Sequence, residues 1–129
     1  MNYDKCLAIQ PDNYPVLNNY SYYLSLRGDK LDQALEMSTR LVANNPEDAT
    51  FLDTHGWVLF VKGDYLAAQK YLSKAASIEN DGTIIEHLGD VLFKLGEVEE
   101  AIETWKRAKE AGGTTDQIDK KIEDKQYYE

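Results

Sequence analysis

The segment LDTHGW, residues 52–57, carries the residue types from which catalytic and metal sites are built. Asp53 and His55 lie two positions apart, and a carboxylate beside an imidazole is the pair that general acid–base catalysis and zinc binding use. Trp57 would supply the wall of a substrate pocket. Whether these side chains form a catalytic site depends on the helices or strands that position them. The pattern of the surrounding sequence indicates which elements these are.

No known catalytic or metal-ligand motif accompanies this segment. The second histidine, His87, is not in an HExxH spacing, and a GxSxG nucleophile motif is absent. Cys6 is the single cysteine, which excludes an internal disulfide and a cysteine-based zinc site. We therefore predict a non-enzymatic protein with no catalytic residues, metal or cofactor. A metal-dependent hydrolase is kept as a remote alternative.

The composition indicates one folded domain and argues against two classes of partner. The chain has 129 residues, of which 43% are hydrophobic, and its net charge is −9. This negative charge disfavours nucleic acids and anionic membrane surfaces. No apolar run reaches the roughly 18 residues that span a bilayer. Nucleic-acid binding and direct membrane insertion are therefore not expected, which leaves a protein or peptide partner open.

Small residues recur along the chain at one interval. Four pairs are each 33 residues apart: Gly56 and Gly89, Gly63 and Gly96, Ala68 and Ala101, Ala75 and Ala108. Apolar residues at helical spacing surround them, so each repeat predicts two antiparallel helices joined by a glycine turn. We call these the first and second helix of a unit. Small side chains where the two helices cross would let them pack closely.

An earlier, more divergent copy of the repeat precedes these two. In LNNYSYYLSLRGDKLDQALEMSTRL, Ser21 takes the place of Gly56, Gly28 that of Gly63 and Ala34 that of Ala68. One hairpin leaves an apolar face uncovered, so successive hairpins are expected to stack on one another.

This pattern resembles the tetratricopeptide repeat family, whose unit is about 34 residues long. The resemblance implies an all-α fold, an α-solenoid of antiparallel helix hairpins in a right-handed superhelix with a C-terminal capping helix. The implied division within one domain is a truncated repeat tail at 1–13, units at 14–48, 49–81 and 82–111, and the capping helix at 112–129. Within that last segment, Thr114 and Gln117 predict a capping box, and Ile118 and Ile122 predict an apolar stripe.

The chain begins inside a repeat, which suggests a piece of a longer protein. LDTHGWVLF, EHLGDVLFKLG and KKIEDKQYYE are similar to C-terminal modules of large bacterial proteins of this family. The compartment stays open between the bacterial cytoplasm and the periplasmic side of the envelope. Tyr3, Leu7 and Ile9 would lie on an uncovered repeat edge, so self-assembly into a homodimer is the alternative function.

The resemblance also implies where a partner binds. First helices of this family line a concave groove, and a three-four-three spacing places one residue set on that face. The predicted groove residues are Asn18, Tyr22, Asp53, Trp57, Phe60, Glu86, Asp90 and Phe93. The aromatic side chains would anchor a peptide or helical segment, and the carboxylates would orient a basic residue on it. An anionic tail is expected to be disfavoured.

Structural roles compete with these functional ones. His55 aligns with Leu88 and Tyr20 on the inward stripe of the first helix, so we predict a partly buried histidine with a hydrogen-bond partner. Trp105 falls in a core position of a second helix. Trp57 and Phe60 would either face the groove or wedge neighbouring units together.

Overall fold

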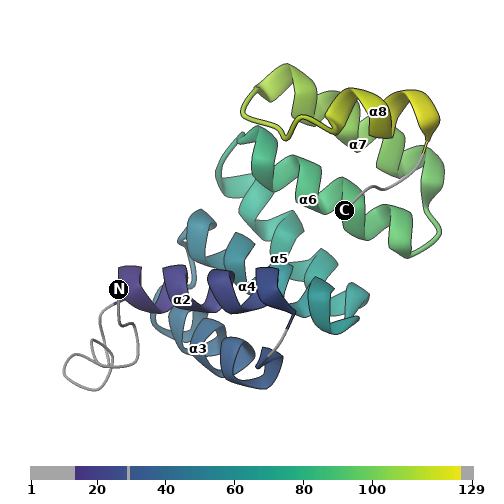
Figure 1. Cartoon of the computed structure of the whole chain (residues 1–129). Coiled ribbons are helices and arrows are strands. Elements are labelled where there is room, and N and C mark those ends of the chain that lie inside the picture. Colours follow the sequence, from purple (N-terminus) through teal and green to yellow (C-terminus); the bar gives the residue numbers. More distant parts are fainter. Residues whose placement is uncertain (1–13, 29, 126–129) are drawn as a thin grey trace.

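The computed structural model describes residues 14–28 and 30–125 (Figure 1). Within these ranges every regular element is a helix: α2 Tyr14–Arg27, α3 Leu31–Asn44, α4 Ala49–Lys62, α5 Tyr65–Ile78, α6 Gly82–Lys94, α7 Val98–Ala111 and α8 Ile118–Asp124. The all-α prediction is therefore confirmed. The proposed repeat tail 1–13, with Tyr3, Leu7 and Ile9 of the self-assembly edge, lies outside the described residues. None of the described helices is both long and apolar enough to span a bilayer.

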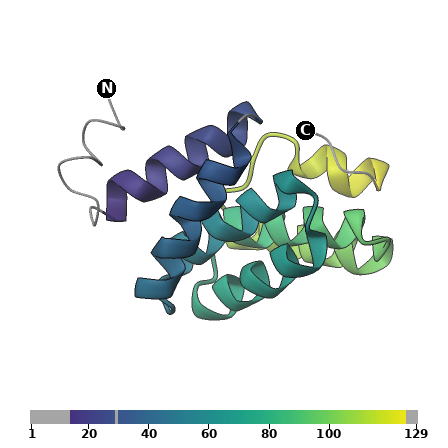
Figure 2. The same cartoon turned by 90° about the horizontal axis from the view of Figure 1, so that it is seen from below.

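The helices form three hairpins, α2–α3, α4–α5 and α6–α7, each packed against the next. Figures 1 and 2 show these hairpins following one another in a stack, with α2 at one end and α8 at the other. The first helices α2, α4 and α6 contact their successors directly, and α8 packs on α7. The stacked arrangement of helix hairpins is as the repeat predicted.

A glycine in the left-handed conformation separates the two helices of each unit. Gly63 has φ 92° and its N–H donates to the Phe60 carbonyl at 3.0 Å, which ends α4. Asp64 follows, and its carboxylate accepts from the Ala67 N–H at 3.3 Å at the start of α5. Gly96 repeats the turn with φ 89°. Residues with a Cβ avoid this conformation, so the predicted glycine turns are confirmed.

The close crossings within hairpins are present as well. A Cβ built on Gly56 would lie 2.7 Å from Leu72 Cγ and 3.4 Å from the Ala68 carbonyl oxygen. A Cβ on Gly89 would lie 2.4 Å from Trp105 Cδ1. Trp105 is completely buried, which confirms its core role.

The start of α8 differs from the prediction. Gln117 is the N-cap residue of this helix, but its side chain makes no capping hydrogen bond, so the Thr114–Gln117 capping box is wrong. Thr115 accepts from the Gln117 N–H at 3.3 Å, and its own N–H and hydroxyl donate to Glu86. The buried Glu86 carboxylate, 29 residues away in the sequence, therefore positions the segment before α8 that the local sequence pattern had predicted to be a capping box. Ile118 is buried and Ile122 packs on the same core, as expected for the apolar stripe.

Candidate binding groove

The residues of LDTHGW contact different units rather than each other. The Asp53 carboxylate lies 2.8 Å from Nδ1 of His87, in the next unit. His55 Nδ1 lies 2.7 Å from the Ser38 hydroxyl, in the preceding unit. His55 is buried, and this burial lowers its pKa to about 4. The predicted hydrogen-bond partner of His55 is present, and its side chain is more completely buried than the predicted partial burial. Asp53 and His55 do not pair with each other.

His87 is the centre of a polar contact between α4 and α6. Burial alone would lower its pKa, but the carboxylates of Asp53, Asp90 and Glu86 act in the opposite direction and leave the pKa raised. The Trp57 ring stacks on the imidazole with a centroid distance of 4.2 Å and an interplanar angle of 26°. Asp53 therefore has its partner within the protein.

Glu86 and Asp90 lie under α8. Their side chains are 1% and 2% exposed, and the Lys121 side chain is 3% exposed. Lys121 Nζ lies 2.6 Å from Glu86 and 2.9 Å from Asp90. The Trp105 indole N–H donates to Asp90 at 3.0 Å. The expectation that both carboxylates line an open groove is wrong, because α8 adds a helix to the stack and Lys121 neutralises the face that it covers.

The two carboxylates respond differently to this shared cation. Burial alone would raise the pKa of Glu86, but hydrogen bonds from Lys121 and Thr115 bring it below its ordinary value. Burial raises the pKa of Asp90 to about 6, although Lys121 opposes the rise. A role for Lys121 was not predicted, although the sequence contains a signal for it. Lys121 follows His87 by about one repeat length, and it pairs with Glu86 as His87 pairs with Asp53.

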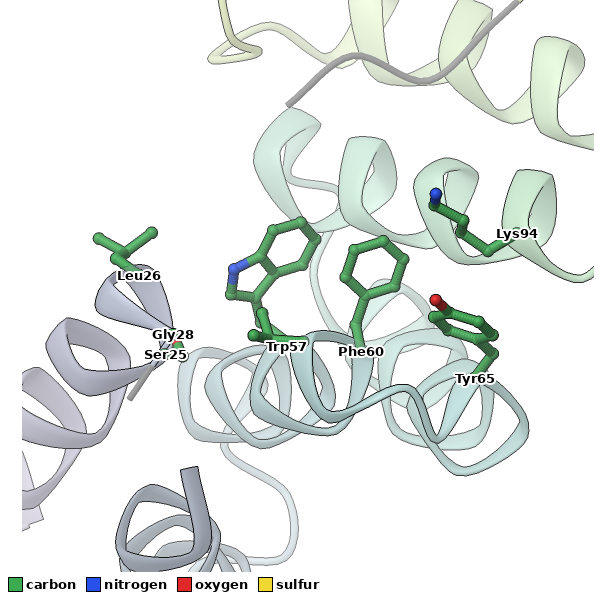
Figure 3. A pocket seen from close by; sticks show the side chains of 8 residues that line it. Ser25, Leu26, Gly28, Trp57, Phe60, Tyr65 and Lys94 are labelled. Carbon is green, nitrogen blue, oxygen red and sulfur yellow. The ribbon is translucent and has the colours of Figure 1, made fainter. Parts of the chain in front are cut away.

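A pocket of about 430 Å³ opens beside α4 (Figure 3). Its lining comes from α2, α4, α5 and α6 and consists of Ser25, Leu26, Gly28, Trp57, Phe60, Val61, Tyr65 and Lys94. The Trp57 and Phe60 rings stack at 4.6 Å and 17°, and Phe60 meets the Tyr65 ring at 5.4 Å. We call this the groove pocket.

The groove pocket gathers only part of the predicted site. Trp57 is half-buried in its wall, and Phe60, 6% exposed, forms its floor. Tyr22 is half-buried, and burial followed by the nearby Asp53 charge raises its pKa. Phe93 lies outside the pocket lining and stacks on Trp105 at 5.9 Å.

Two buried polar atoms of the predicted site lack a partner in the part of the chain that the structure describes. They are Asn18 Oδ1 and Trp57 Nε1. A buried donor or acceptor without a partner costs about 1–3 kcal/mol, so such atoms are uncommon away from binding sites. Figure 3 shows the Trp57 nitrogen on the side of the ring that faces α2.

Sequence reasoning predicted Trp57 and Phe60 but missed several other members of the pocket, among them Leu26, Tyr65 and Lys94. All three lie within two residues of a helix end, beyond the regular face from which the groove residues were predicted. Leu26 is 62% exposed at the rim of the pocket. Its exposure is visible only in the structure, so helical spacing provides no signal for it.

The fold and groove define a helical-repeat protein, and comparison with known proteins identifies the family. A family model described as "Anaphase-promoting complex, cyclosome, subunit 3" matches residues 28–108. The chain belongs to the tetratricopeptide repeat family, as the repeat pattern suggested.

Two curated relatives carry the same repeat. The chain is 32% identical over 84 residues to "TPR repeat-containing protein PA4667" of Pseudomonas aeruginosa, a match that covers 65% of this chain and 14% of that protein. It is 32% identical over 74 residues to "TPR repeat-containing protein MJ1428" of Methanocaldococcus jannaschii, which covers 57% and 13%. The chain thus spans a small fraction of either relative.

Solved structures confirm the fold. The TPR domain of Sgt2 from Aspergillus fumigatus superposes with a TM-score of 0.80 at 16% identity, covering 88% of this chain and 77% of that one. YrrB, described as a TPR protein with an unusual peptide-binding site, gives 0.71 at 25% identity over 87% and 58%. The first TPR of Spaghetti (RPAP3), bound to the HSP90 peptide SRMEEVD, gives 0.77 at 17% identity over 87% and 89%.

Proposed function

We propose that this chain is a non-catalytic interaction scaffold that binds a peptide or helical segment of a partner protein in its groove. The observation that carries this proposal is the groove pocket, in which α2, α4 and the start of α5 place apolar and aromatic side chains around one open cavity. Proteins of this repeat family serve as interaction scaffolds, and the peptide-binding structures above support the same role here.

The side chains of the pocket suit an anchoring role. Trp57 and Leu26 offer apolar area to a ligand, and Phe60 closes the floor beneath it. Aromatic residues in such pockets contribute much of the binding free energy at protein interfaces.

The carboxylates contribute less to this proposal than the sequence suggested. Glu86 and Asp90 are paired with Lys121 under α8, and Asp53 is paired with His87. Recognition of a basic residue by Glu86 is therefore not part of the proposal. Apolar anchoring on Trp57 and Leu26 is its basis.

Two exposed leucines give a matched test. Peptides would be selected from a random short-peptide library on the immobilised chain, and their Kd measured by fluorescence anisotropy. Leu26→Ala should raise Kd about fivefold or more, since Leu26 lines the pocket. Leu66→Ala removes a leucine that is 72% exposed and outside the pocket lining, so it should leave Kd unchanged.

Circular dichroism would show that both variants keep their helicity, since neither leucine is buried. Trp57→Ala should weaken the same peptides more strongly. Selection of no peptide, or equal effects of Leu26→Ala and Leu66→Ala, would contradict binding in the groove pocket.

A further inference from the structure

His87 connects the polar contact between α4 and α6 to the wall of the groove pocket. Its Nδ1 atom lies 2.8 Å from the Asp53 carboxylate, and its ring stacks on the Trp57 indole with centroids 4.2 Å apart. Trp57 lines the groove pocket and stacks in turn on Phe60, with centroids 4.6 Å apart. The imidazole, which is not part of the pocket lining, therefore supports a side chain that a bound segment would contact.

Both contacts of His87 favour its protonated form. An imidazolium donates a charge-assisted hydrogen bond to the Asp53 carboxylate, and a cation is attracted to the face of an indole ring. A neutral imidazole with its proton on Nδ1 keeps the hydrogen bond, but it loses both charge-dependent attractions. Loss of the proton therefore weakens the contacts that hold the Trp57 ring in place.

The charged groups around His87 come from three helices. Burial alone would lower the pKa of His87, but the charges of Asp53 on α4 and of Asp90 and Glu86 on its own helix raise that pKa above its ordinary value of 6.5. Lys121 of α8 pairs with Glu86 and Asp90. Within the described residues, α5 and α7 contribute no group to this set. His87 thus keeps its proton to a higher pH than an exposed histidine does.

Three neighbouring groups keep one charge state between pH 6.5 and 9. Burial, followed by the nearby Asp53 charge, raises the pKa of Tyr22 on α2 above its ordinary value of 10, so Tyr22 stays neutral. Burial raises the pKa of Asp90 to about 6, so Asp90 is mostly ionised. Burial lowers the pKa of His55 to about 4, so His55 is neutral. A change of charge at the Trp57 ring in this range therefore comes from His87.

We propose, as an extension of the proposed function, that His87 makes binding in the groove pocket sensitive to pH, because protonated His87 holds the Trp57 ring in the pocket wall. A bound segment that packs on Trp57 then favours the protonated state, so affinity falls as pH rises through the His87 titration. By the same linkage, a bound segment raises the pH at which His87 loses its proton.

The first test measures Kd at intervals between pH 6.5 and 9. The probes are Leu26-dependent peptides from the random library that contain no histidine or cysteine and are acetylated at the N-terminus, so that they do not titrate in this range. Kd should rise about threefold with pH, the size expected for loss of one cation–π contact. Circular dichroism at each pH would show that the helicity is kept.

Variants of the two histidines and of Asp53 separate a titration from a structural effect. His87→Gln should abolish the rise in Kd. Asp53→Asn keeps a hydrogen-bonding side chain but removes the charge that favours the imidazolium, so the midpoint of the rise should move to lower pH. His55→Asn is the matched control, and it should leave the midpoint and the size of the rise unchanged because His55 is already neutral in this range.

A second measurement needs no peptide. In NMR spectra, the indole N–H signal of Trp57 should shift with pH at the same midpoint as the His87 imidazole signals. The chain has two tryptophans and two histidines, so Trp57→Phe and His55→Asn would assign these signals.

The outcomes separate this inference from the proposed function. A Trp57 signal that does not follow His87, a Kd that is independent of pH, or an unchanged midpoint in Asp53→Asn would overturn the inference and leave groove binding intact. A library that yields no Leu26-dependent peptide would overturn both.

Discussion

Lys121 shows how a single residue can fix the end of this stack. A buried ammonium group is tolerated when opposite charges and hydrogen bonds surround it. Here Glu86 and Asp90 both contact its Nζ atom, while Thr115 and Trp105 donate to the same carboxylates. Two acidic groups share one cation, so removing that cation would leave two buried carboxylates facing each other without compensation.

We predict that Lys121→Met lowers the free energy of unfolding by about 3–5 kcal/mol at neutral pH, because it leaves buried charge unpaired. Urea denaturation would measure the loss. Lys120→Met, on the exposed side of the same helix, is the control and should change stability by less than about 0.5 kcal/mol. The deficit should narrow as pH falls and the carboxylates take up protons. Equal stability of the two variants would refute a stabilising role for this cluster.

The two histidines respond to pH in opposite directions. The pKa of His55 is lowered to about 4 from an ordinary value of 6.5, so its neutral form is favoured in the folded state. Its contribution to stability is complete above pH 6.5 and is lost as pH falls toward 4. The pKa of His87 is raised beside Asp53, so its contribution is complete below pH 6.5 and is lost as pH rises through that raised pKa.

We expect the His55 effect to amount to about 3 kcal/mol between neutral pH and pH 4. His55→Asn keeps a polar atom near the position of Nδ1, which contacts Ser38, but cannot become protonated. Urea denaturation of both chains across this range would test the idea. The unaltered chain should lose about 3 kcal/mol more than the variant over the same interval. Parallel stability curves would show that His55 does not titrate as its burial requires.

At the scale of helices, the glycines at equivalent positions of two units face different side chains where the helices of the hairpin cross. Gly56 faces the flexible end of Leu72 across α4 and α5, whereas Gly89 faces the rigid indole of Trp105 across α6 and α7. Trp105 also donates to Asp90, so the indole has little freedom to move away.

Gly89→Ala should therefore destabilise the protein by about 1–3 kcal/mol, and by more than Gly56→Ala at the equivalent position. In Gly56→Ala, rotation of Leu72 relieves part of the clash, and alanine also favours a helix more than glycine does. Thermal and urea denaturation of the two variants would give the order. A larger loss in Gly56→Ala would contradict the crossing geometry.

The elements themselves were largely predictable from the sequence. Each repeat of 33 residues contains one helix hairpin, and the turn glycine reflects backbone conformation within that hairpin. The local sequence pattern was therefore enough to predict helices such as α4 and α6. The start of α8 was not predictable in this way. Thr115 is held by Glu86, a contact between residues 29 apart that no capping rule contains.

At the scale of the whole molecule, helical spacing predicted some of the side chains that share a face, but not what covers that face. Helical spacing predicts which side chains share a face, and Trp57 and Phe60 do line one pocket. The pairs Asp53–His87 and Glu86–Lys121 connect successive units at separations of 34 and 35 residues. These contacts depend on how units stack, so spacing within one helix did not reveal them.

The stack leads to a final prediction, that the loss of α8 acts locally. In a helical repeat each unit is stabilised mainly by its neighbours. A chain that ends after Gly113 would lose Ile118 and Lys121 from the last unit, while Glu86 and Asp90 would gain contact with water. Water then solvates these carboxylates. The loss of unfolding free energy per unpaired carboxylate should therefore be smaller in the truncated chain than in Lys121→Met, where α8 still covers both carboxylates.

Hydrogen exchange would show where the loss of α8 is felt. Amides of α6 and α7 should lose protection, whereas those of α3 and α4 should keep it, because α8 packs mainly on α7 among the helices that the structure describes. Since α8 contributes no residue to the groove pocket, the truncated chain should bind the selected peptides with unchanged Kd at temperatures where it remains folded. If all helices lost protection to the same extent, the stack would unfold as one unit. The prediction that loss of α8 acts locally would then be wrong.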